Sequence, residues 1–390
     1  MPAESYLSRG VSPTKDDVKS AIIGQTKGIF PGAFCKILPD PLGDPEYCVA
    51  MHADGAGTKS AVAYLGYKEN ANPSYFRGIA QDSLVMNLDD LICIGAVDNF
   101  LVSNTIGRNA HRIDQAVLKN VIDGYQEFID SMKPYGITIT MSGGETADVG
   151  DLVATIIVDS TVFVRFHRKK VIDCDRIQPG DVIVGLASFG QASYERSVNS
   201  GIGSNGLTAA RHLLLAHDYA TKYPETYSPT IEMSKVYCGR YQFNDHLPGS
   251  SQTVGEALLA PTRTYLPVIK KVLETLADKI HGMIHCTGGG QVKCKSFGKG
   301  LHYIKDRLFP TPPIFAAIKA QGEIKPFEMY QIFNMGHRLE VYCDRETASQ
   351  IIAIAEKYQV EAKVVGQVEP NEDPRENKVT VRHEGEEYSY

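Results

Sequence analysis

The chain has 390 residues, of which 43% are hydrophobic and 22% charged, as is ordinary for a globular protein that buries real cores. This length predicts two domains, or three. The formal net charge is −6, and no Lys/Arg stripe with interleaved aromatic residues occurs, which argues against a general nucleic-acid binder. The basic cluster at residues 167–170 is interpreted as a solvated linker.

The eight cysteines include no C-x-x-C pair, so neither a zinc site nor a disulfide framework is predicted. Reduced thiols are typical of the cytosol. The N-terminus lacks an apolar signal core, and no run of about 18 apolar residues could span a bilayer. These features predict a cytoplasmic protein with no membrane segment.

The first half of the chain alternates between helical and extended patterns. In chain order, the predicted elements are a helix at 16–30, a strand at 47–52, helices at 59–65 and 75–94, a strand at 100–106, a helix at 111–132, and strands at 137–141 and 152–166. The helix at 111–132 is the clearest, because its apolar residues recur at three- and four-residue spacing. The strand at 137–141 should run directly into a Gly-Gly-Glu turn.

A domain boundary is expected between residues 168 and 181, which gives an N-terminal domain at 1–170 and a C-terminal domain at 171–390. The second domain is predicted to contain a strand at 182–187, helices at 204–217 and 262–279, strands at 282–286 and 338–343, a helix at 346–358, and strands at 362–368 and 378–382. Residues 218–253 are interpreted as an insertion or lid rather than a core element. The alternation argues for α/β or α+β layers in each half.

Two acidic, glycine-flanked runs carry most of the functional information. They are Asp-Gly-Ala-Gly-Thr-Lys at 54–59 and Ser-Gly-Gly-Glu-Thr-Ala-Asp at 142–148. Magnesium prefers oxygen ligands, and glycines let the backbone approach a phosphate closely. Neither run is a Walker A or a dinucleotide motif. We therefore predict that Asp54 and Glu145 meet in space and jointly bind a magnesium–triphosphate.

The other candidates are weighed against plainer interpretations. A single carboxylate is more often solvated, and glycine context favours only Asp54 and Glu145 as ligands. Adjacent helical residues do not share a face, so only one of Asp89 and Asp90 can point at the site. Lys59 either neutralises phosphate charge from a helix N-terminus or is an exposed first-turn lysine.

Two glycine turns in the second half are candidates for substrate binding. Residues 203–206 open a helix, where free N–H groups favour an anion such as a ribose 5-phosphate, although Ser204 could equally be only an N-cap. The Thr-Gly-Gly-Gly run at 287–290 follows a strand and is more suggestive of close approach. His285 beside it could act as a base, or could be a structurally satisfied histidine.

Taken in order, these runs resemble the phosphoribosylformylglycinamidine cyclo-ligase (aminoimidazole ribonucleotide synthetase) family. The resemblance spans nearly the whole chain. It is carried by the runs at 54–59, 89–91, 94–96, 143–147, 204–206, 258–263 (Leu-Leu-Ala-Pro-Thr-Arg), 287–290 and 333–336 (Phe-Asn-Met-Gly). The Pro-Thr-Arg and triple-glycine runs point to this member of a wider group that uses ATP on other substrates.

The resemblance implies an α+β or α/β chain that forms a homodimer, with a barrel-like interface between mixed-sheet N-terminal domains and an α/β C-terminal domain. It implies ATP and Mg²⁺ as cofactors, a small ribonucleotide substrate, and no nucleic-acid or membrane partner. The implied catalytic residues are Lys59, Asp90 and Glu145. The implied nucleotide contacts are Lys27, Asp54, Gly55, Gly57, Thr58, Lys59, Gly143, Gly144 and Thr146. The implied metal ligands are Asp54, Asp89, Asp90, Glu145 and Asp148. The implied substrate contacts are Ser204, Asn205, Gly206, Thr262, Arg263, Thr287, Gly288, Gly289, Gly290 and Asn334.

The chain departs from the family pattern at four of these places. Asp89 stands where the family usually has asparagine, and Asp148 where it has glutamate. Gly203 replaces a histidine, so that substrate contact cannot be carried over. Arg338 brings charge to a turn that the family keeps small.

The implied reaction converts formylglycinamidine ribonucleotide and ATP into aminoimidazole ribonucleotide, ADP and phosphate. The catalytic acid and base are left unnamed at this point. The alternatives are a related ATP-dependent small-molecule kinase or activating enzyme, and a nucleotide-binding protein whose chemistry has decayed. Replacing Glu145 with glutamine should abolish turnover and leave the fold intact.

Overall fold

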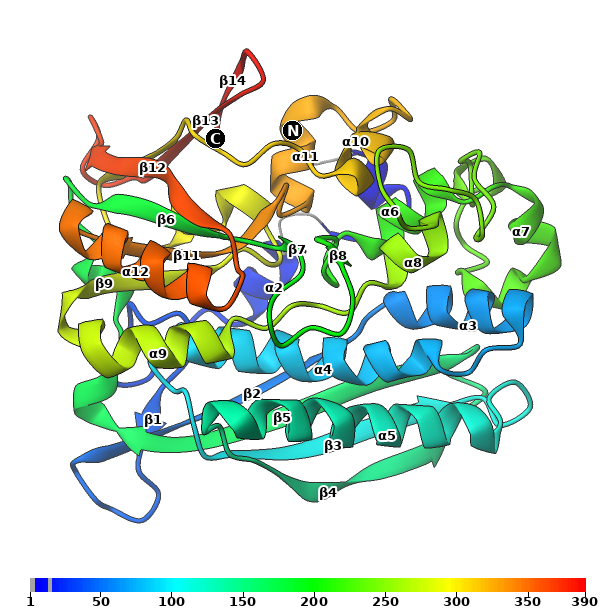
Figure 1. The fold of residues 1–390 in the computed structure, drawn as a ribbon, viewed down its shortest axis with the longest axis horizontal. Helices are drawn as coiled ribbons and strands as arrows, with labels where there is room; N and C mark the ends of the chain where they lie inside the picture. Colours follow the sequence, from blue (N-terminus) through cyan, green and yellow to red (C-terminus); the bar gives the residue numbers. More distant parts are fainter. Residues whose placement is uncertain (1–3, 13–15) are drawn as a thin grey trace.

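The computed structural model describes residues 4–12 and 16–390. Two sheets organise the chain, one in each half (Figure 1). The elements of the first half are α1 (Glu4–Leu7), α2 (Asp16–Ala21), β1 (Leu38–Pro39), β2 (Tyr47–Gly55), α3 (Lys59–Asn70), α4 (Tyr75–Ile92), β3 (Phe100–Arg108), α5 (Gln115–Met132), β4 (Ile139–Asp148) and β5 (Ile156–His167). Short 3-10 helices follow at Lys133–Tyr135, Arg168–Lys170 and Cys174–Arg176.

The second half begins with β6, which opens a new sheet. Its elements are β6 (Val182–Ala187), β7 (Phe189–Gly190), β8 (Asn199–Ser200), α6 (Leu207–Leu214), α7 (Asp218–Lys222), α8 (Val254–Leu259), α9 (Leu266–Leu276), β9 (Ile280–His285), β10 (Leu301–Lys305), α10 (Pro313–Lys319), α11 (Pro326–Ile332), β11 (His337–Cys343), α12 (Arg345–Lys357), β12 (Ala362–Pro370), β13 (Lys378–His383) and β14 (Glu386–Ser389). Further 3-10 helices lie at Pro224–Thr226, Met233–Lys235, Ala277–Lys279 and Gly290–Ser296.

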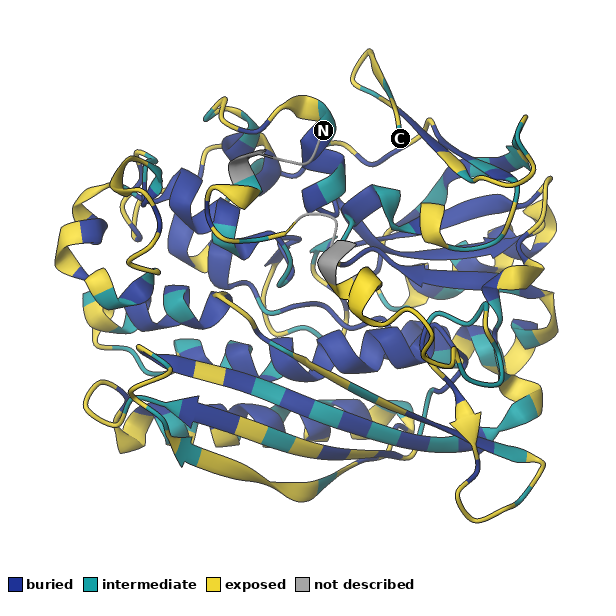
Figure 2. Cartoon of the chain, turned by 180° about the vertical axis from the view of Figure 1, so that it is seen from behind, coloured by how far each residue is buried: buried dark blue, intermediate teal, exposed yellow. Residues whose placement is uncertain are grey.

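The first sheet has the strand order β1-β2-β5-β3-β4 and is mixed, because β3 and β4 run parallel. Helices α4 and α5 cover one face, and Figure 2 looks onto the other, which no helix of residues 4–12 or 16–390 covers. Burial along β5 alternates strictly, as expected for a strand with one buried face. The uncovered face exposes Met51, Leu101 and Ile157.

The second sheet has the order β14-β13-β10-β12-β6-β11-β9. Strands β10 and β13 run parallel, and the other neighbouring strands described are antiparallel. The α+β expectation is therefore confirmed, and the sheet of the C-terminal half is mixed. Helices α9 and α12 pack together beside this sheet (Figure 1).

Helix α4 lies between the first sheet and the second half, so it is buried on most sides. Its buried polar residues lie along two faces of the helix. Asp82 and Asp89, seven residues apart, face the second half, while Asn87 and Asp90 face β2. A helix placed between two layers can bury carboxylates only where both layers provide partners.

Two local predictions need correction. The Gly-Gly-Glu run is part of strand β4 rather than a turn after it, because the run continues to pair with β3. Ser204 is not the N-cap of α6. The N-cap is Gly206, whose φ of 85° is left-handed, and it caps without a side-chain hydrogen bond.

The expectation that residues 218–253 contribute no core element is wrong. Tyr219, Tyr237 and Phe243 are almost fully buried there. The Tyr237 ring packs against Tyr219 in an edge-on arrangement, with centroids 6.4 Å apart. The segment is also bound to α3, since Lys222 and the Tyr223 hydroxyl both contact Glu69. It is a packed subcore rather than an open lid.

A buried histidine in this subcore predicts pH-dependent stability. Burial, with Arg211 and Arg9 nearby, lowers the pKa of His212 to about 2. Its Nδ1 accepts the Tyr237 N–H, and its Nε2 has no hydrogen-bond partner in the described chain. The folded protein thus keeps His212 neutral, while the unfolded chain binds a proton below pH 6.5. The contribution of His212 to stability is therefore present above about pH 6.5 and is lost as the pH falls.

We expect the free energy of unfolding of the native protein to fall by about 2 kcal/mol more than that of a His212→Gln variant between pH 7 and pH 5. Urea unfolding at both pH values measures this difference. Equal pH dependence in the two proteins would show that His212 protonates in the folded state.

Among the residues described, no helix is both long enough and apolar enough to cross a membrane.

Candidate functional site

The run at 54–59 lies where β2 ends and α3 begins. Asp54 is exposed, and one of its oxygens accepts the N–H of Gly55 at 2.7 Å. Gly57 has a φ of 58°, and a Cβ at this position would meet no atom within 4 Å. The backbone thus takes a conformation suited to glycine and leaves open space above the turn.

The structure brings this turn beside the turn at 203–206. The Thr58 hydroxyl contacts the Thr208 hydroxyl in the first turn of α6 at 2.9 Å. The first turns of α3 and α6, which lie in different halves of the chain, are therefore neighbours. Helix N-termini carry free N–H groups and a positive dipole end, so two regions that favour anions adjoin.

Lys59 does not face this open space. Its side chain is fully buried, and its Nζ donates to Asp82 at 2.8 Å and to the carbonyl of Ala260 at 2.5 Å. Asp82 also accepts the N–H and hydroxyl of Thr262. Burial lowers the pKa of Lys59, while Asp82 raises it. The predicted phosphate contact does not fit this arrangement, in which Lys59 joins the two halves.

Asp90 lies between two histidines from different halves. Its Oδ1 is 2.6 Å from His285 Nδ1, and its Oδ2 is 3.1 Å from His52 Nε2. Burial opposes ionisation of Asp90, but the two imidazoles prevail and hold its pKa below the usual range. Asp90 therefore orients both rings as an ionised carboxylate.

The protonation of His52 follows from its neighbours. Its Nδ1 faces the Asn87 side-chain oxygen at 2.9 Å, and the Asn87 amide nitrogen donates to three carbonyls, which fixes that orientation. Both ring nitrogens of His52 must therefore donate. Burial lowers the pKa of His52, but Asp90 and Asn87 outweigh it and the net pKa is raised. The raised pKa favours a protonated His52, and the ring is partly exposed.

His285 is the opposite case. Its Nε2 accepts the Nε–H of Arg338 at 2.9 Å, so Nδ1 carries the proton that is donated to Asp90. The ring is fully buried. It links Asp90 to Arg338 and does not act as a free base.

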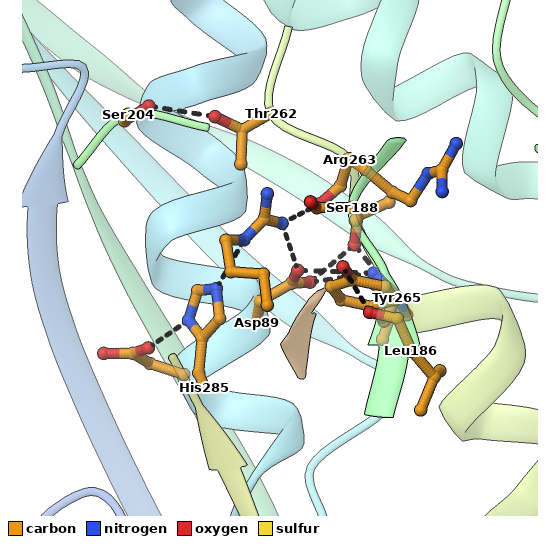
Figure 3. A network of polar contacts seen from close by, with 12 residues as sticks. Asp89, Leu186, Ser188, Ser204, Thr262, Arg263, Tyr265 and His285 are labelled. Atoms are coloured by element: carbon orange, nitrogen blue, oxygen red, sulfur yellow. Dashed lines mark hydrogen bonds and ion pairs between the residues drawn. The ribbon is translucent and has the colours of Figure 1, made fainter. Parts of the chain in front are cut away.

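Asp89 is fully buried and cannot be a metal ligand in this arrangement. It accepts hydrogen bonds from the Thr264 hydroxyl, the Tyr265 N–H and Arg338 Nη2. Figure 3 shows Asp89 at the centre of this network. The charge that Arg338 brings is thus balanced by the carboxylate of Asp89.

Asp54 and Glu145 do not meet within one chain, so the predicted shared cation is wrong for a single chain. Asp54 pairs with Ser160, Ser160 with Asn104, and Asn104 with Gly144. This row spans three strand spacings, about 14 Å. Glu145, one residue further, points to the opposite face, because side chains alternate along a strand. It is exposed on the uncovered face of the sheet.

The neighbours of Glu145 share its position on β4, the edge strand of the sheet. Gly143 has a φ of 112°, and Gly144 lies against Asn104, which leaves no room for a Cβ. Gly143, Gly144 and Thr146 are exposed and lie far from the turn at 54–58 in one chain. Asp148 forms an ion pair with Arg108 at 2.7 Å, so it too is already partnered.

Three predicted substrate contacts are turned inward and hold other elements in place. Thr262 bonds Asp82 and the Ser204 hydroxyl. Arg263 is fully buried and forms a bidentate pair with Glu195 at 3.0 and 2.5 Å. The Asn334 amide donates to the carbonyls of residues 201 and 202, which fixes the start of the turn at 203–206.

The remaining predicted contacts lie on loops and range from buried, as at Thr287 and Gly290, to exposed, as at Gly288 and Lys27. Ser204 and Asn205 are half-buried at the turn before α6. Thr287 and Gly288–Gly290 follow β9 directly, and a Cβ at Gly288 would meet no atom within 4 Å. Lys27 is exposed just before Gly28, which pairs with Ile37.

Two residues of the site were missed by sequence reasoning. His52 shares the face of β2 that carries Asp54, and the alternation of that strand was the available signal. Asp159 on β5 pairs with Gly55. Burial chiefly, and then the charge of Asp54, raises the pKa of Asp159. Asp54 and Asp159 both stand where β2 and β5 pair next to the glycine turn, and carboxylate oxygens are ligands that suit Mg²⁺.

A cavity of about 440 Å³ lies elsewhere, between α4, α5 and residues 194–199. Its charged lining residues are paired, since Arg77 and Arg196 both bind Glu127. None of the glycine turns borders it, and we do not assign it to the reaction.

Two family models match the chain: AIR synthase related protein, N-terminal domain, over residues 33–164, and AIR synthase related protein, C-terminal domain, over residues 178–377. The chain belongs to the AIR synthase related protein family. It is similar to the phosphoribosylformylglycinamidine cyclo-ligases of Methanocaldococcus jannaschii (32% identity over 86% of this chain and 82% of the relative) and Methanococcus vannielii (32% over 84% and 79%). The enzyme of that name from Desulfotalea psychrophila is 28% identical over 87% and 83%.

Among solved structures, this AIR synthase related chain is similar to T. maritima PurL complexed with FGAR (16% identity, TM-score 0.54), covering 92% of this chain and 46% of that one. It therefore spans about half the length of that protein. It is also similar to the hydrogenase maturation protein HypE in complex with ATP (14% identity, TM-score 0.55, covering 87% and 84%). At these identities the likeness shows the fold alone.

Proposed function

We propose that this protein catalyses the ATP-dependent closure of formylglycinamidine ribonucleotide to aminoimidazole ribonucleotide, with release of ADP and phosphate. The observation that carries the proposal is the contact between Thr58 and Thr208, which puts the Asp54 turn beside the turn at 203–206. One turn suits a polyphosphate and the other a ribonucleotide. The relatives named as cyclo-ligases supply the identity of the substrate.

The chemistry requires an oxygen to become a leaving group. An amide oxygen leaves poorly, and transfer of the γ-phosphoryl group to it gives an iminophosphate. A neighbouring nitrogen then attacks the amide carbon, the C–O bond to the phosphorylated oxygen breaks, and inorganic phosphate leaves as the ring closes. In such transfers the protein mainly positions the reactants and neutralises charge. Asp54 and Asp159, with the Thr58 hydroxyl, would hold a magnesium ion, which would supply positive charge to neutralise the phosphates.

The His52 side chain lies on the same face of β2 as that of Asp54. We propose that it supplies positive charge and a proton there. Its contacts with Asn87 and Asp90 favour the protonated ring, and Asp90 holds the ring in place. In this proposal Asp90 acts through the two histidines rather than on the metal. Lys59 acts by holding α3 against the second half.

We also propose a homodimer formed through the uncovered face of the first sheet. That face exposes Met51 and Leu101, and apolar side chains on an open sheet face are usually covered by a partner. Glu145 lies on the same side of the sheet and would reach a nucleotide only in a site shared with a second chain.

The eight free cysteines support the cytoplasm as the place of action.

The test is to incubate the purified protein with ATP, magnesium and formylglycinamidine ribonucleotide, and to measure aminoimidazole product by a colour reaction. We expect product that depends on all three components. ATP turnover only with some other small acceptor would favour the related kinase, the second candidate that the HypE-like fold keeps open. Nucleotide binding without any turnover would indicate decayed chemistry.

A further inference from the structure

The guanidinium of Arg338 on β11 is held rigidly. Its Nε donates to His285, and its Nη2 donates to Asp89 at 3.2 Å and to the carbonyl of Arg263. Its flat face lies over the Tyr265 ring, 5.3 Å from the centroid. These contacts leave the group little freedom to reorient.

The third nitrogen, Nη1, is different. It donates no hydrogen bond to any residue that the structure describes, although a guanidinium carries five N–H donors and buried donors are normally satisfied. The side chain is only 3% exposed, and Nη1 is not among the fully enclosed atoms of the described chain that lack a partner, so a ligand can reach it. A ligand that binds next to it would supply the missing acceptor.

Next to Nη1 lies the glycine turn at residues 203–206, which precedes α6. A Cβ at Gly203 would lie 3.5 Å from Nη1, and Gly203 has a φ of 69°. The absent side chain therefore leaves Nη1 facing the turn from which the eight-residue helix α6 begins. Asp89 lies on the Nη2 side of the guanidinium, so it does not cover Nη1.

We propose that Arg338 Nη1 binds the phosphate group of the ribonucleotide substrate at the turn of residues 203–206, and so selects phosphorylated over unphosphorylated substrate. A fixed guanidinium edge and the first N–H groups of a helix are both donors that suit a phosphate. The inference rests on the proposed function for the identity of the substrate. It does not depend on which base-like group the ribose phosphate carries.

The experiment compares two variants that lack the Asp89 charge, because removing Arg338 alone would leave a buried carboxylate unpaired. Affinities of Asp89→Asn and of the double variant D89N/R338M are measured by calorimetry for formylglycinamidine ribonucleotide and for its dephosphorylated nucleoside. Ribose 5-phosphate and ribose form a second pair of probes. Thermal unfolding confirms that both variants are folded.

We expect the double variant to bind each phosphorylated probe about 10- to 100-fold more weakly than D89N does, since a charge-assisted hydrogen bond is lost. The unphosphorylated probes should change less than about 3-fold. Equal affinities in the two variants, or equal losses for phosphorylated and unphosphorylated probes, would overturn the inference, as would a native protein that binds no phosphorylated probe. A protein that cyclises nothing but shows the phosphate-specific loss with ribose 5-phosphate would keep this inference and reject the proposed function.

Discussion

Replacing Lys59 with methionine should lower the free energy of unfolding by about 3–5 kcal/mol, the usual cost of leaving a buried charge without its partner. The Asp82 carboxylate would remain fully buried, with one oxygen bonded to Thr262 and the other already without a partner in the described chain. Urea unfolding measures the loss. The Lys59→Met, Asp82→Asn double variant should recover most of it.

A matched control lies on α5, where Lys119 forms an exposed ion pair with Asp123 and is 71% exposed. Lys119→Met should change stability by less than about 1 kcal/mol, because exposed pairs contribute little. If Lys59→Met were as stable as the native protein and lost only activity, Lys59 would be a phosphate contact after all.

Single substitutions Asp54→Asn and Glu145→Gln should each reduce turnover by about 100-fold or more, since each removes charge from an electrostatically organised site. Both carboxylates are exposed, so neither change should cost much stability. The two residues lie on opposite faces of one sheet, and the proposed dimer offers a way to bring them into one site.

That arrangement is tested by mixing the two inactive variants, unfolding them partially and letting the chains reassociate. A mixed dimer would contain one site with both native carboxylates, so activity should return to about a quarter of the native value in a random mixture of two-chain assemblies. Reassociated homodimers of each variant are the control. No recovery, although mixed dimers form, would place Asp54 and Glu145 in separate roles.

The sequence predicts most of what is local in this protein. The glycine turns at 54–58 and 203–206 were recognisable because glycine adopts positive φ values, such as 58° at Gly57 and 69° at Gly203, more readily than other residues do. The strands β2 and β6 and the helix α5 followed from periodicity. Each of these depends on neighbours in the chain.

Side-chain contacts and strand pairings between residues far apart in the chain could not be predicted in the same way. Lys59 sits at a helix N-terminus, where a lysine suggests phosphate binding, and only tertiary packing shows that Asp82 and Ala260 bind it. Glu145 was expected in a turn, and its pairing with β3 extends the strand through it. The pairing of Asp89 with Arg338 joins residues 249 positions apart.

The most direct test of the proposed chemistry follows the oxygen that must leave. Formylglycinamidine ribonucleotide labelled with ¹⁸O in its formyl amide is converted by the purified protein with ATP and magnesium in ordinary water. The phosphate released is then examined by mass spectrometry. We predict one ¹⁸O in each phosphate formed per aminoimidazole product, because the phosphoryl group is transferred to that oxygen. Unlabelled phosphate, with the label lost to water, would contradict the account.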